Sequence, residues 1–519
     1  MYGSNRTNGG TIVGTNRRAD SNLWPVLGLD AETAPSILII LAGTVLIGGA
    51  LYFSHGNIFA GAAVLAVMGL LLITWYRVDL SLYVLYGMVL VFDQFHIPGF
   101  YPITYTLDFF RNLKEISFLP TISAGVMNPI EIHLVLILFV WFLVVAIKKR
   151  FALRSVPAWG PAILFFGWLL LAYAMGIQQG GDFLTALWEV RALFYLGVVY
   201  IVVPQIIQTR RQVEIFMWVT IGAITVKALQ AIARFIALGF SFGGRPTLTN
   251  HEDPVFIVTL FVLAIGLVLF NSKHRQKLIL LLLALPLYMG FFLGQRRAAY
   301  ASFIISMGAF VFLLPRIARW KFIKAAVPVV ILALIYFAAF WNSNSTLASP
   351  VQQIKSGIYG LDRDVVSDQD YYSNLYREYE NYNLAYTTRR HPVMGVGFGR
   401  KYEQPLGLAN INFPLRDYIP HNEIFWVIVK TGGIGFFLFW LFFNSVGAKA
   451  ASLSMRIQDP YLKAIAVMIA IAIINQMTVS FYDLQLTYYR NMIYLGALMG
   501  LLPTLEHLAP EKGENNAKQ

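Results

Sequence analysis

The feature that most constrains this chain is a series of apolar stretches, each of roughly 16 to 25 residues, that recurs from end to end. Folded as a helix, a stretch of that length crosses about 30 Å of hydrocarbon. About fourteen stretches qualify, at residues 37–53, 58–75, 80–95, 130–147, 161–176, 192–207, 213–238, 254–270, 278–293, 298–314, 322–341, 424–444, 464–481 and a last one that ends near 502. The third and the last are the weakest. The chain is therefore expected to cross a membrane many times.

Composition supports this expectation, because 57% of the 519 residues are hydrophobic, only 13% are charged and the mean hydropathy is +0.61. These values exclude a soluble fold. The runs are also long and continuous, whereas strands of an outer-membrane barrel alternate over about ten residues. We predict an all-α polytopic membrane protein with about 14 transmembrane helices and a large extracytoplasmic loop before the twelfth.

Lysine and arginine clusters occupy alternate connections, which is the positive-inside pattern. The clusters are Arg77; Lys148, Lys149, Arg150 and Arg154; Arg210 and Arg211; Lys273, Arg275 and Lys277; Arg316, Arg319, Lys321 and Lys324; and Lys449, Arg456 and Lys463. The pattern predicts a cytoplasmic tail over 1–33, helices one to eleven over 34–341, an outer loop over 342–423, helices twelve to fourteen over 424–505, and a cytoplasmic tail over 506–519. The same distribution argues against a nucleic-acid partner despite the net charge of +13.

The N-terminal residues and the absence of cysteine give two further expectations. The polar first thirty-odd residues lack the apolar core of a cleavable signal peptide, so we expect the first helix to direct insertion. Cysteine is absent, which removes disulfide and thiolate chemistry.

The outer loop contains a tyrosine-rich segment, DQDYYSNLYREYENYNLAY. At helical spacing, Tyr372, Leu375, Tyr376 and Tyr379 fall on one face of an interfacial helix. That helix either caps the bundle or contacts substrate. Further along, the segment HPVMGVGFGRKY places Gly395, Gly397 and Gly399 between apolar residues, which suits either turn geometry or a phosphate-cradling turn.

The stretch PHNEIFWVIVKTGGIGFF puts His421, Asn422 and Glu423 at the start of the twelfth helix. A helix N-terminus presents free amide donors and a positive dipole end, which suits an anionic ligand such as pyrophosphate. The same field favours a neutral imidazole that can accept a proton. A cap or a lipid headgroup contact is the simpler alternative for His421.

Positive residues on the outer side run against the charge bias of the chain. The turn GQRRAAY carries Arg296 and Arg297, and GGRPTLTNHEDP carries Arg245 just ahead of the eighth helix. Arginine binds phosphate oxygens in bidentate fashion, so these residues are candidate ligands for phosphate. Lys227 and Arg234 lie seven apart on one face of the seventh helix, where a charge faces a cavity or a partner, or snorkels to the surface.

Several of these stretches resemble the bacterial O-antigen ligase and O-antigen polymerase family. NLYREYENYNLAYTTRRHPVMGVGFG followed by PHNEIFWVIVKTGGIGFFLFW is similar to the family's glycine-rich element and its histidine–asparagine element. GQRRAAY is similar to a serine–arginine element, and GGRPTLTNHEDP to a glycine–arginine element. The resemblance covers residues 245–440 in the family's order, and it departs from the pattern at Arg296, where the family has serine.

The resemblance implies a GT-C glycosyltransferase that acts on the outer leaflet of the bacterial inner membrane without a nucleotide sugar, a metal or another cofactor. Its donor would be a glycan on undecaprenyl diphosphate. By position, His421 matches the family's essential histidine, Arg297 the arginine of the serine–arginine element, and Arg245 the arginine ahead of the next helix. His421 would act as general base, while Arg245 and either Arg296 or Arg297 would stabilise the lipid diphosphate.

Alternatives remain at the level of function. A polymerase transfers the growing chain to another lipid-linked glycan, whereas a ligase transfers it to lipid A core; the long outer loop and the helix count favour the polymerase. A chain-length regulator would be a further partner, alongside the surrounding membrane lipids. A flippase would predict a two-fold repeat and broken helices at the midplane, of which only Lys227 gives a sign. A scaffold would not need the histidine and arginines.

Overall fold

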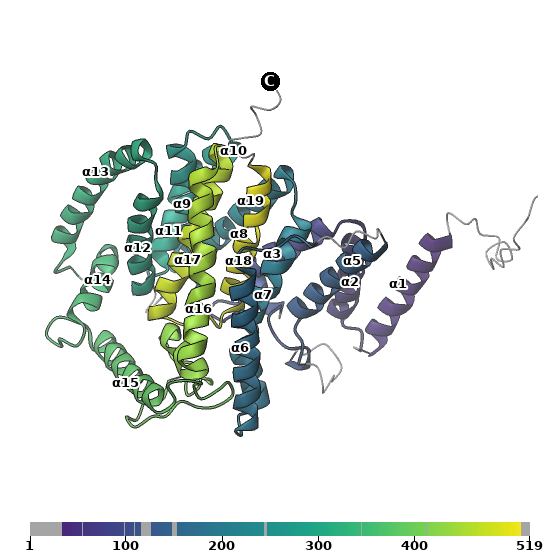
Figure 1. The fold of residues 1–519 in the computed structure, drawn as a ribbon, viewed down its shortest axis with the longest axis horizontal. Coiled ribbons are helices and arrows are strands. Elements are labelled where there is room, and N and C mark those ends of the chain that lie inside the picture. The colour runs from purple at the N-terminus through teal and green to yellow at the C-terminus, as the bar shows by residue number, and fades with distance from the viewer. Residues whose placement is uncertain are drawn as a thin grey trace, which may run out of the picture. The chain divides into compact units, whose positions relative to one another are not determined.

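The structure is a computed structural model that describes residues 34–509, apart from 54, 98, 108, 116–125, 148–152, 243–246, 344 and 412. The predicted tail over 1–33, residues 510–519 of the predicted tail over 506–519, and residues 148–150 of the second predicted charge cluster thus lie outside the described residues. The described part of the chain is built from helices and contains no strand (Figure 1). It divides into two compact units, residues 1–72 with 114–125, and residues 73–113 with 126–519.

The first unit contributes α1 (Ala34–Phe53) and most of α2 (Ile58–Tyr76). Neither helix carries a charged residue, and each has apolar side chains on all of its faces. Such a sequence is typical of a helix that faces hydrocarbon rather than water.

The second unit contains all the other helices. They are α3 (Val78–Val91), α4 (Ile103–Thr106), α5 (Pro129–Ile147), α6 (Trp159–Gln178), α7 (Phe183–Ile206), α8 (Arg210–Ala237), α9 (Asp253–Leu269), α10 (Arg275–Leu282), α11 (Ala284–Leu293), α12 (Arg297–Leu313), α13 (Arg316–Phe340), α14 (Ser349–Tyr359), α15 (Asp368–Arg390), α16 (Glu423–Arg456), α17 (Pro460–Tyr482), α18 (Tyr489–Gly500) and α19 (Leu502–Leu508). Two short 3₁₀ helices, Leu113–Glu115 and Thr346–Ala348, also occur among the described residues.

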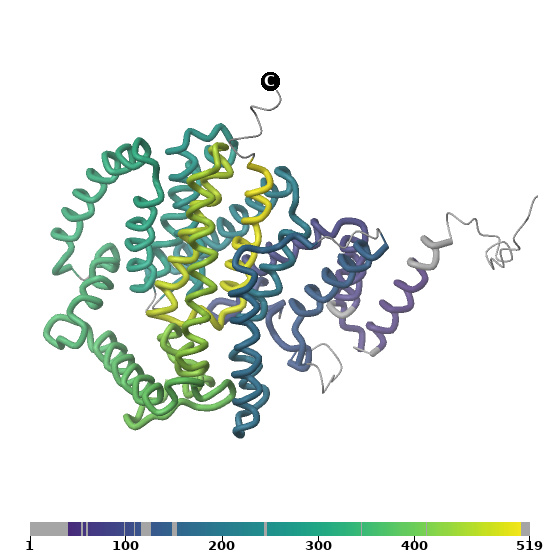
Figure 2. The backbone as a smooth tube through the Cα atoms, in the orientation of Figure 1, coloured from purple at the N-terminus to yellow at the C-terminus, as the bar shows by residue number. Residues whose placement is uncertain are grey.

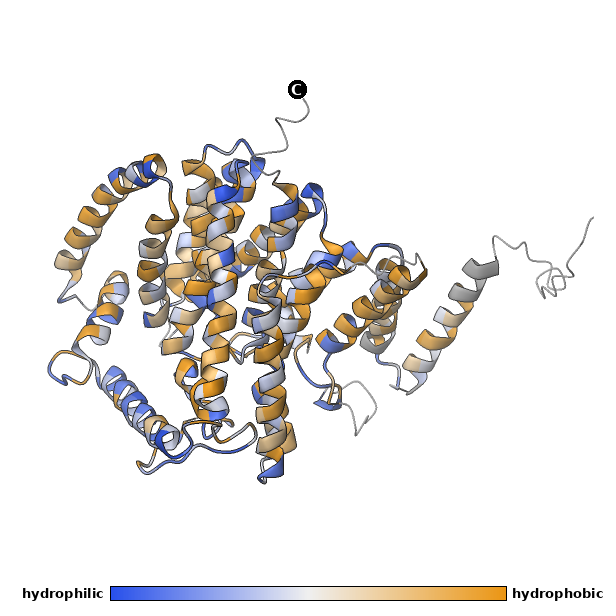
Figure 3. Ribbon diagram, viewed as in Figure 1, coloured by the Kyte–Doolittle hydropathy of each residue, from blue (hydrophilic) through white to orange (hydrophobic). Residues whose placement is uncertain are grey.

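The core of the second unit is centred on α7, α17 and α18. Nearly every residue of α18 is buried, and α7 and α17 are largely enclosed by their neighbours. By contrast, α13 buries almost none of its side chains and lies at the edge of the unit (Figure 1). Apolar residues dominate the long helices, whereas α15 is mainly polar (Figure 3).

The prediction of an all-α membrane protein is confirmed, and each of the fourteen apolar stretches lies on helices. Seven described helices are long and apolar enough to cross a membrane, or eight if α10 and α11, which meet at a 51° bend, form one span. Five further apolar helices are shorter, and α18 has only 12 residues. The exact number of fourteen spans is therefore not confirmed.

The segment between α13 and α16 forms the outer part of the candidate site. From α13 the chain passes through α14 and α15 along one side of the unit and then returns as α16 (Figure 2). The tyrosine-rich segment folds as α15, as expected. Its Ser367 side chain caps the N-terminus, and the acidic first turn and basic last turn complement the helix dipole.

The glycine-rich loop after α15 is packed between α6 and α16. The N–H of Gly397 donates to the Lys430 carbonyl, and a Cβ on Gly397 would lie 2.5 Å from the Cα of Gly176. At the same place α16 is kinked at Gly432, whose φ is 67°. Only glycine tolerates both the positive φ and the close approach of two backbones. The loop therefore fixes where the first turns of α16 lie.

A buried ion pair supports this packing. The Lys430 ammonium group lies 2.7 Å from the carboxylate of Glu189 on α7, and both side chains are fully buried. Glu189 also accepts the N–H of Gly399, and Lys430 donates to the carbonyl of Arg400. Hydrogen bonds at both ends of the pair compensate the cost of desolvating two charges.

Candidate functional site

The N-terminus of α16 is held in place by the residues on either side of His421. The side chain of Asn422 caps the helix by accepting the N–H of Phe425. Glu423, which is fully buried, accepts the N–H groups of residues 485, 486 and 487 in the connection after α17. The side chains of two predicted substrate-binding residues, Asn422 and Glu423, thus stabilise the N-terminus of α16.

His421 is paired with a carboxylate from α15. Its Nδ1 lies 3.2 Å from an oxygen of Glu380, and its own backbone N–H donates to the same oxygen at 2.9 Å. Glu380 is only 1% exposed, so the pair is shielded from water on this side. A carboxylate at Nδ1 selects the tautomer with the proton on Nδ1 and leaves Nε2 as the acceptor.

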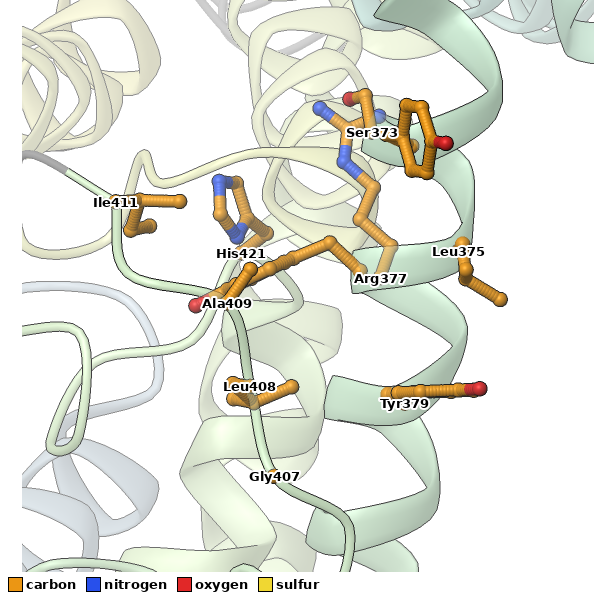
Figure 4. A pocket seen from close by; sticks show the side chains of 11 residues that line it. Ser373, Leu375, Arg377, Tyr379, Gly407, Leu408, Ala409, Ile411 and His421 are labelled. Carbon is orange, nitrogen blue, oxygen red and sulfur yellow. The ribbon is translucent and has the colours of Figure 1, made fainter. Parts of the chain in front are cut away.

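A cavity of about 510 Å³ opens beside His421. It is lined by Tyr372, Ser373, Leu375, Tyr376, Arg377 and Tyr379 of α15, by Gly407, Leu408, Ala409 and Ile411, and by His421 itself. His421 lies between α15 and the segment 407–411 (Figure 4). The face of α15 that the tyrosine spacing marked in the sequence therefore faces the histidine. No hydrogen bond from a described residue reaches its Nε2.

Three arginines lie close to one another at this site, and one of them, Arg377, lines the cavity. Arg297, at the start of α12, donates to the Ser356 hydroxyl at 3.0 Å and to the Asn374 side chain at 2.6 Å, and so ties α12 to α14 and α15. Arg296 and Arg377 each have a buried Nε atom for which the described residues provide no hydrogen-bond partner. The positive charges of all three arginines interact.

Arg296 is linked to a second histidine pair. One of its terminal nitrogens contacts Nε2 of His251, and Nδ1 of His251 lies 3.1 Å from the carboxylate of Asp483. Burial and the neighbouring Arg296 lower the pKa of His251. Burial alone would raise the pKa of Asp483, but His251 and Arg296 hold it well below its ordinary value. His421 is a further, smaller cause of the lowered pKa of His251, which indicates that the two histidine pairs lie near each other.

Four of the predicted substrate-binding residues contact other parts of the protein and do not line this cavity. Lys227 forms a buried ion pair with Asp93, and Arg234 donates to the Leu248 carbonyl at 2.9 Å. The N–H groups of Gly395 and Gly397 donate to backbone carbonyls. Arg245 lies outside the described residues.

The sequence analysis did not single out Glu380, Arg377 or Asp483. A signal for Glu380 was present, because it lies one turn after Tyr376 on α15, whereas Arg377 lies off the face that the tyrosine spacing defined. For Asp483 no local signal exists, since it meets His251 across 232 positions of the sequence. Among the described residues, no three His, Asp or Glu side chains are grouped as they would be around a metal ion.

Comparison with known protein families found one match, which covers most of the residues of this site. Residues 260–440 match the family model described as O-antigen ligase. The chain carries the domain of the O-antigen ligase and polymerase family. The match runs from α9 into α16, and it includes both arginines at the start of α12, the His421–Glu380 pair and the cavity. A comparison with curated proteins found no match.

The ligase domain confirms the family resemblance drawn from the sequence motifs, and it indicates a membrane glycosyltransferase of the ligase or polymerase type. Members of this family act on lipid-linked glycans. His251 and Asp483 lie outside the matched range, yet they complete the arginine side of the site.

Proposed function

We propose that this protein transfers a glycan from undecaprenyl diphosphate to a sugar hydroxyl of a lipid-linked acceptor, as a polymerase of O-antigen or exopolysaccharide. The observation that carries the proposal is the His421–Glu380 pair at the wall of the cavity, inside the ligase domain. A histidine with a carboxylate behind one nitrogen and an open second nitrogen is the arrangement of a general base.

In the proposed reaction, Nε2 of His421 takes the proton of the acceptor hydroxyl. The freed oxygen attacks the anomeric carbon as the bond from that carbon to the diphosphate breaks, and the lipid diphosphate leaves with the electron pair. Direct displacement inverts the anomeric configuration. Glu380 holds the ring and stabilises the imidazolium that forms, and general-base catalysis of this kind is worth about 10²- to 10⁴-fold in rate.

The leaving diphosphate needs positive groups that are not already engaged. The buried Nε–H donors of Arg296 and Arg377 have no hydrogen-bond partner among the described residues, whereas Arg297 is held by Ser356 and Asn374. We therefore assign the diphosphate contact to Arg296 and Arg377, and assign Arg297 to positioning α14 and α15. Arg245 is a further diphosphate ligand on the strength of the family resemblance. Such donors stabilise charge that develops in the transition state.

The acceptor sugar is expected on the tyrosine face of α15. Tyr372 and Tyr379 are 58% and 40% exposed, so large areas of both rings are available for contact. Sugar rings present an apolar face that packs on aromatic side chains, while their hydroxyls need polar partners such as Ser373. Leu408 faces Tyr379 across the cavity (Figure 4).

A ligase that attaches the glycan to lipid A core is the second candidate, and the description of the matched family favours it. The length of the segment from 342 to 423 and the number of apolar stretches favour the polymerase. In both cases the site would face the periplasm, with both termini in the cytoplasm of a bacterial inner membrane, and a chain-length regulator would accompany a polymerase.

The test is a reconstituted reaction with purified protein and an undecaprenyl-diphosphate glycan, analysed by gel and mass spectrometry. Wild type is compared with His421→Ala, Arg297→Ala and, as a control on the same helix as Glu380, Glu378→Gln. Lengthened lipid-linked glycan from wild type and the control alone would support the polymerase. Product that forms only after addition of lipid A core would support the ligase. Full activity of His421→Ala would refute both.

A further inference from the structure

A second cavity, of about 810 Å³, lies in the second unit far from His421. It is enclosed by the end of α2, the start of α3, the end of α5, residues 153–154 and the connection between α7 and α8. Along α7, this cavity lies at the C-terminal end, whereas Asp182 at the N-terminus contacts Gly399 of the glycine-rich loop. A helix of 24 residues is about 36 Å long, so the two cavities lie near opposite ends of the bundle.

The lining of this cavity includes an arginine whose backbone is held in place by a neighbouring side chain. Gln205 holds Arg154 in place by two hydrogen bonds, one to the Arg154 N–H at 3.0 Å and one to its carbonyl at 2.9 Å. The Nη1 atom of Arg154 is buried, and the described residues give it no hydrogen-bond partner. A buried charged donor without an acceptor is unfavourable, so an anionic oxygen at this position would stabilise the fold.

Further polar groups lie around the same cavity. Arg77 forms a bidentate pair with Asp79 and keeps 64% of its side chain exposed, and the amides of Gln208 and Gln212 line the wall. The charged side chains of the lining are thus two arginines and one aspartate, with a net positive charge. A single negative group is the complementary ligand.

Other residues of the lining are apolar. Trp141, Val144 and Val145 come from the last turns of α5, and Ile206 from the end of α7. Helix ends of this kind lie where acyl chains meet headgroups, and tryptophan is enriched at that level. A cavity lined by both arginines and apolar side chains fits a molecule that has an anionic head and a hydrocarbon tail.

We infer that this cavity binds the headgroup phosphate of an anionic phospholipid, with Arg154 as the principal contact and Arg77 as the second. Under the predicted topology the site faces the cytoplasmic leaflet. The bound lipid would bridge α3, α5 and α7, and its acyl chains would lie along Trp141. This inference is independent of the reaction proposed for His421, because the two sites share no residue.

The experiment is native mass spectrometry of the full chain after delipidation in detergent, titrated with phosphatidylglycerol or with phosphatidylcholine. Wild type is expected to retain phosphatidylglycerol at least tenfold more tightly than phosphatidylcholine. Arg154→Gln is expected to lose that preference. Arg316→Gln, which removes the same charge from an exposed position at the start of α13, is the matched control and should bind as wild type does.

Two results would overturn the inference. One is an unchanged preference for phosphatidylglycerol in Arg154→Gln. The other is thermal stabilisation of wild type by inorganic phosphate alone to the same degree as by phosphatidylglycerol, which would identify an anion site without lipid specificity. If Arg154→Gln does not elute as a monodisperse species, Arg77→Gln decides: a weakened preference supports the site, and an unchanged one refutes it.

Discussion

The Nδ1 atom of His421 lies 3.2 Å from the carboxylate of Glu380, a residue 41 positions earlier that reaches the histidine from α15. The pair joins α15 to the residues just before α16. The general-base role proposed for His421 would therefore depend on how α15 packs, and not only on the histidine motif.

Glu380→Gln is expected to lower kcat by roughly 10- to 100-fold with little change in KM for the acceptor. The amide cannot stabilise the imidazolium that forms as His421 takes a proton, but it occupies the same space. Steady-state kinetics with lipid-linked substrates would measure the effect, and Glu378→Gln on the exposed side of α15 is the control. If the two residues act as a unit, Glu380→Gln combined with His421→Ala should be no worse than His421→Ala alone. Additive losses would contradict this pairing.

Arg377→Gln is expected to lower kcat/KM for the diphosphate donor by about 10- to 100-fold, because charge-assisted hydrogen bonds contribute about 1.5–3 kcal/mol each. Its buried Nε has no partner among the described residues. Arg389→Gln, an exposed charge in the last turn of the same helix, should be close to wild type. Arg297→Gln should instead lower the thermal midpoint, because Arg297 ties α12 to α14 and α15. Equal effects of Arg377→Gln and Arg389→Gln would show that only net charge matters.

Glu252, next to His251, is predicted to make stability depend on pH. Burial raises the pKa of this carboxyl from its ordinary value of 4.5 to about 7, and neither of its oxygens has a hydrogen-bond partner among the described residues. The folded state therefore keeps the proton that the unfolded chain loses. Stability from this group is present below pH 4.5 and is lost as pH rises to about 7, on the order of 1 kcal/mol per pH unit.

The corresponding measurement is the thermal unfolding midpoint of wild type and Glu252→Gln between pH 4.5 and 8. The advantage of Glu252→Gln should grow up to pH 7 and then stay constant, while Arg490 keeps its contact with Asp253 at 2.8 Å in both proteins. Glu378→Gln should run parallel to wild type throughout. A constant difference between wild type and Glu252→Gln across this range would show that Glu252 does not titrate there.

Gly397→Ala is expected to lower the thermal midpoint sharply. The new Cβ would lie 2.5 Å from the Cα of Gly176, and the φ of +79° disfavours any other L-residue. Overpacking alone costs about 1–3 kcal/mol. The matched control is Gly407→Ala, where a Cβ would meet nothing within 4 Å. A normal midpoint with a raised KM for the donor would instead support the phosphate-cradling interpretation of this loop.

Much of the helical architecture could be predicted from the sequence because the requirement is local. Backbone groups in hydrocarbon must be satisfied within their own helix, so each membrane segment is visible as one apolar run. Where the runs are interrupted, the prediction is less exact: α10 and α11 meet at a bend, and α3, α9 and α12 are shorter than a full span. Those breaks depend on packing against neighbouring helices.

The position of the site was also accessible from sequence, because His421, Arg296 and Arg297 lie in short motifs of a recognisable family. The tyrosine spacing identified the face of α15 that lines the cavity. Helical periodicity determines which residues share a face, and it is readable without a structure.

What only the tertiary structure decided is which groups meet across helices. Glu380 and Asp483 become partners of His421 and His251 through contacts between distant segments. Arg297 is engaged by Ser356 and Asn374, while Arg296 and Arg377 each keep a donor that no described residue pairs with. The glycines of the loop after α15 serve close packing against α6 and α16 for the same reason. The amino-acid sequence determined the helices and the chemical groups that they carry; their pairing depends on helix packing, which no local pattern specifies.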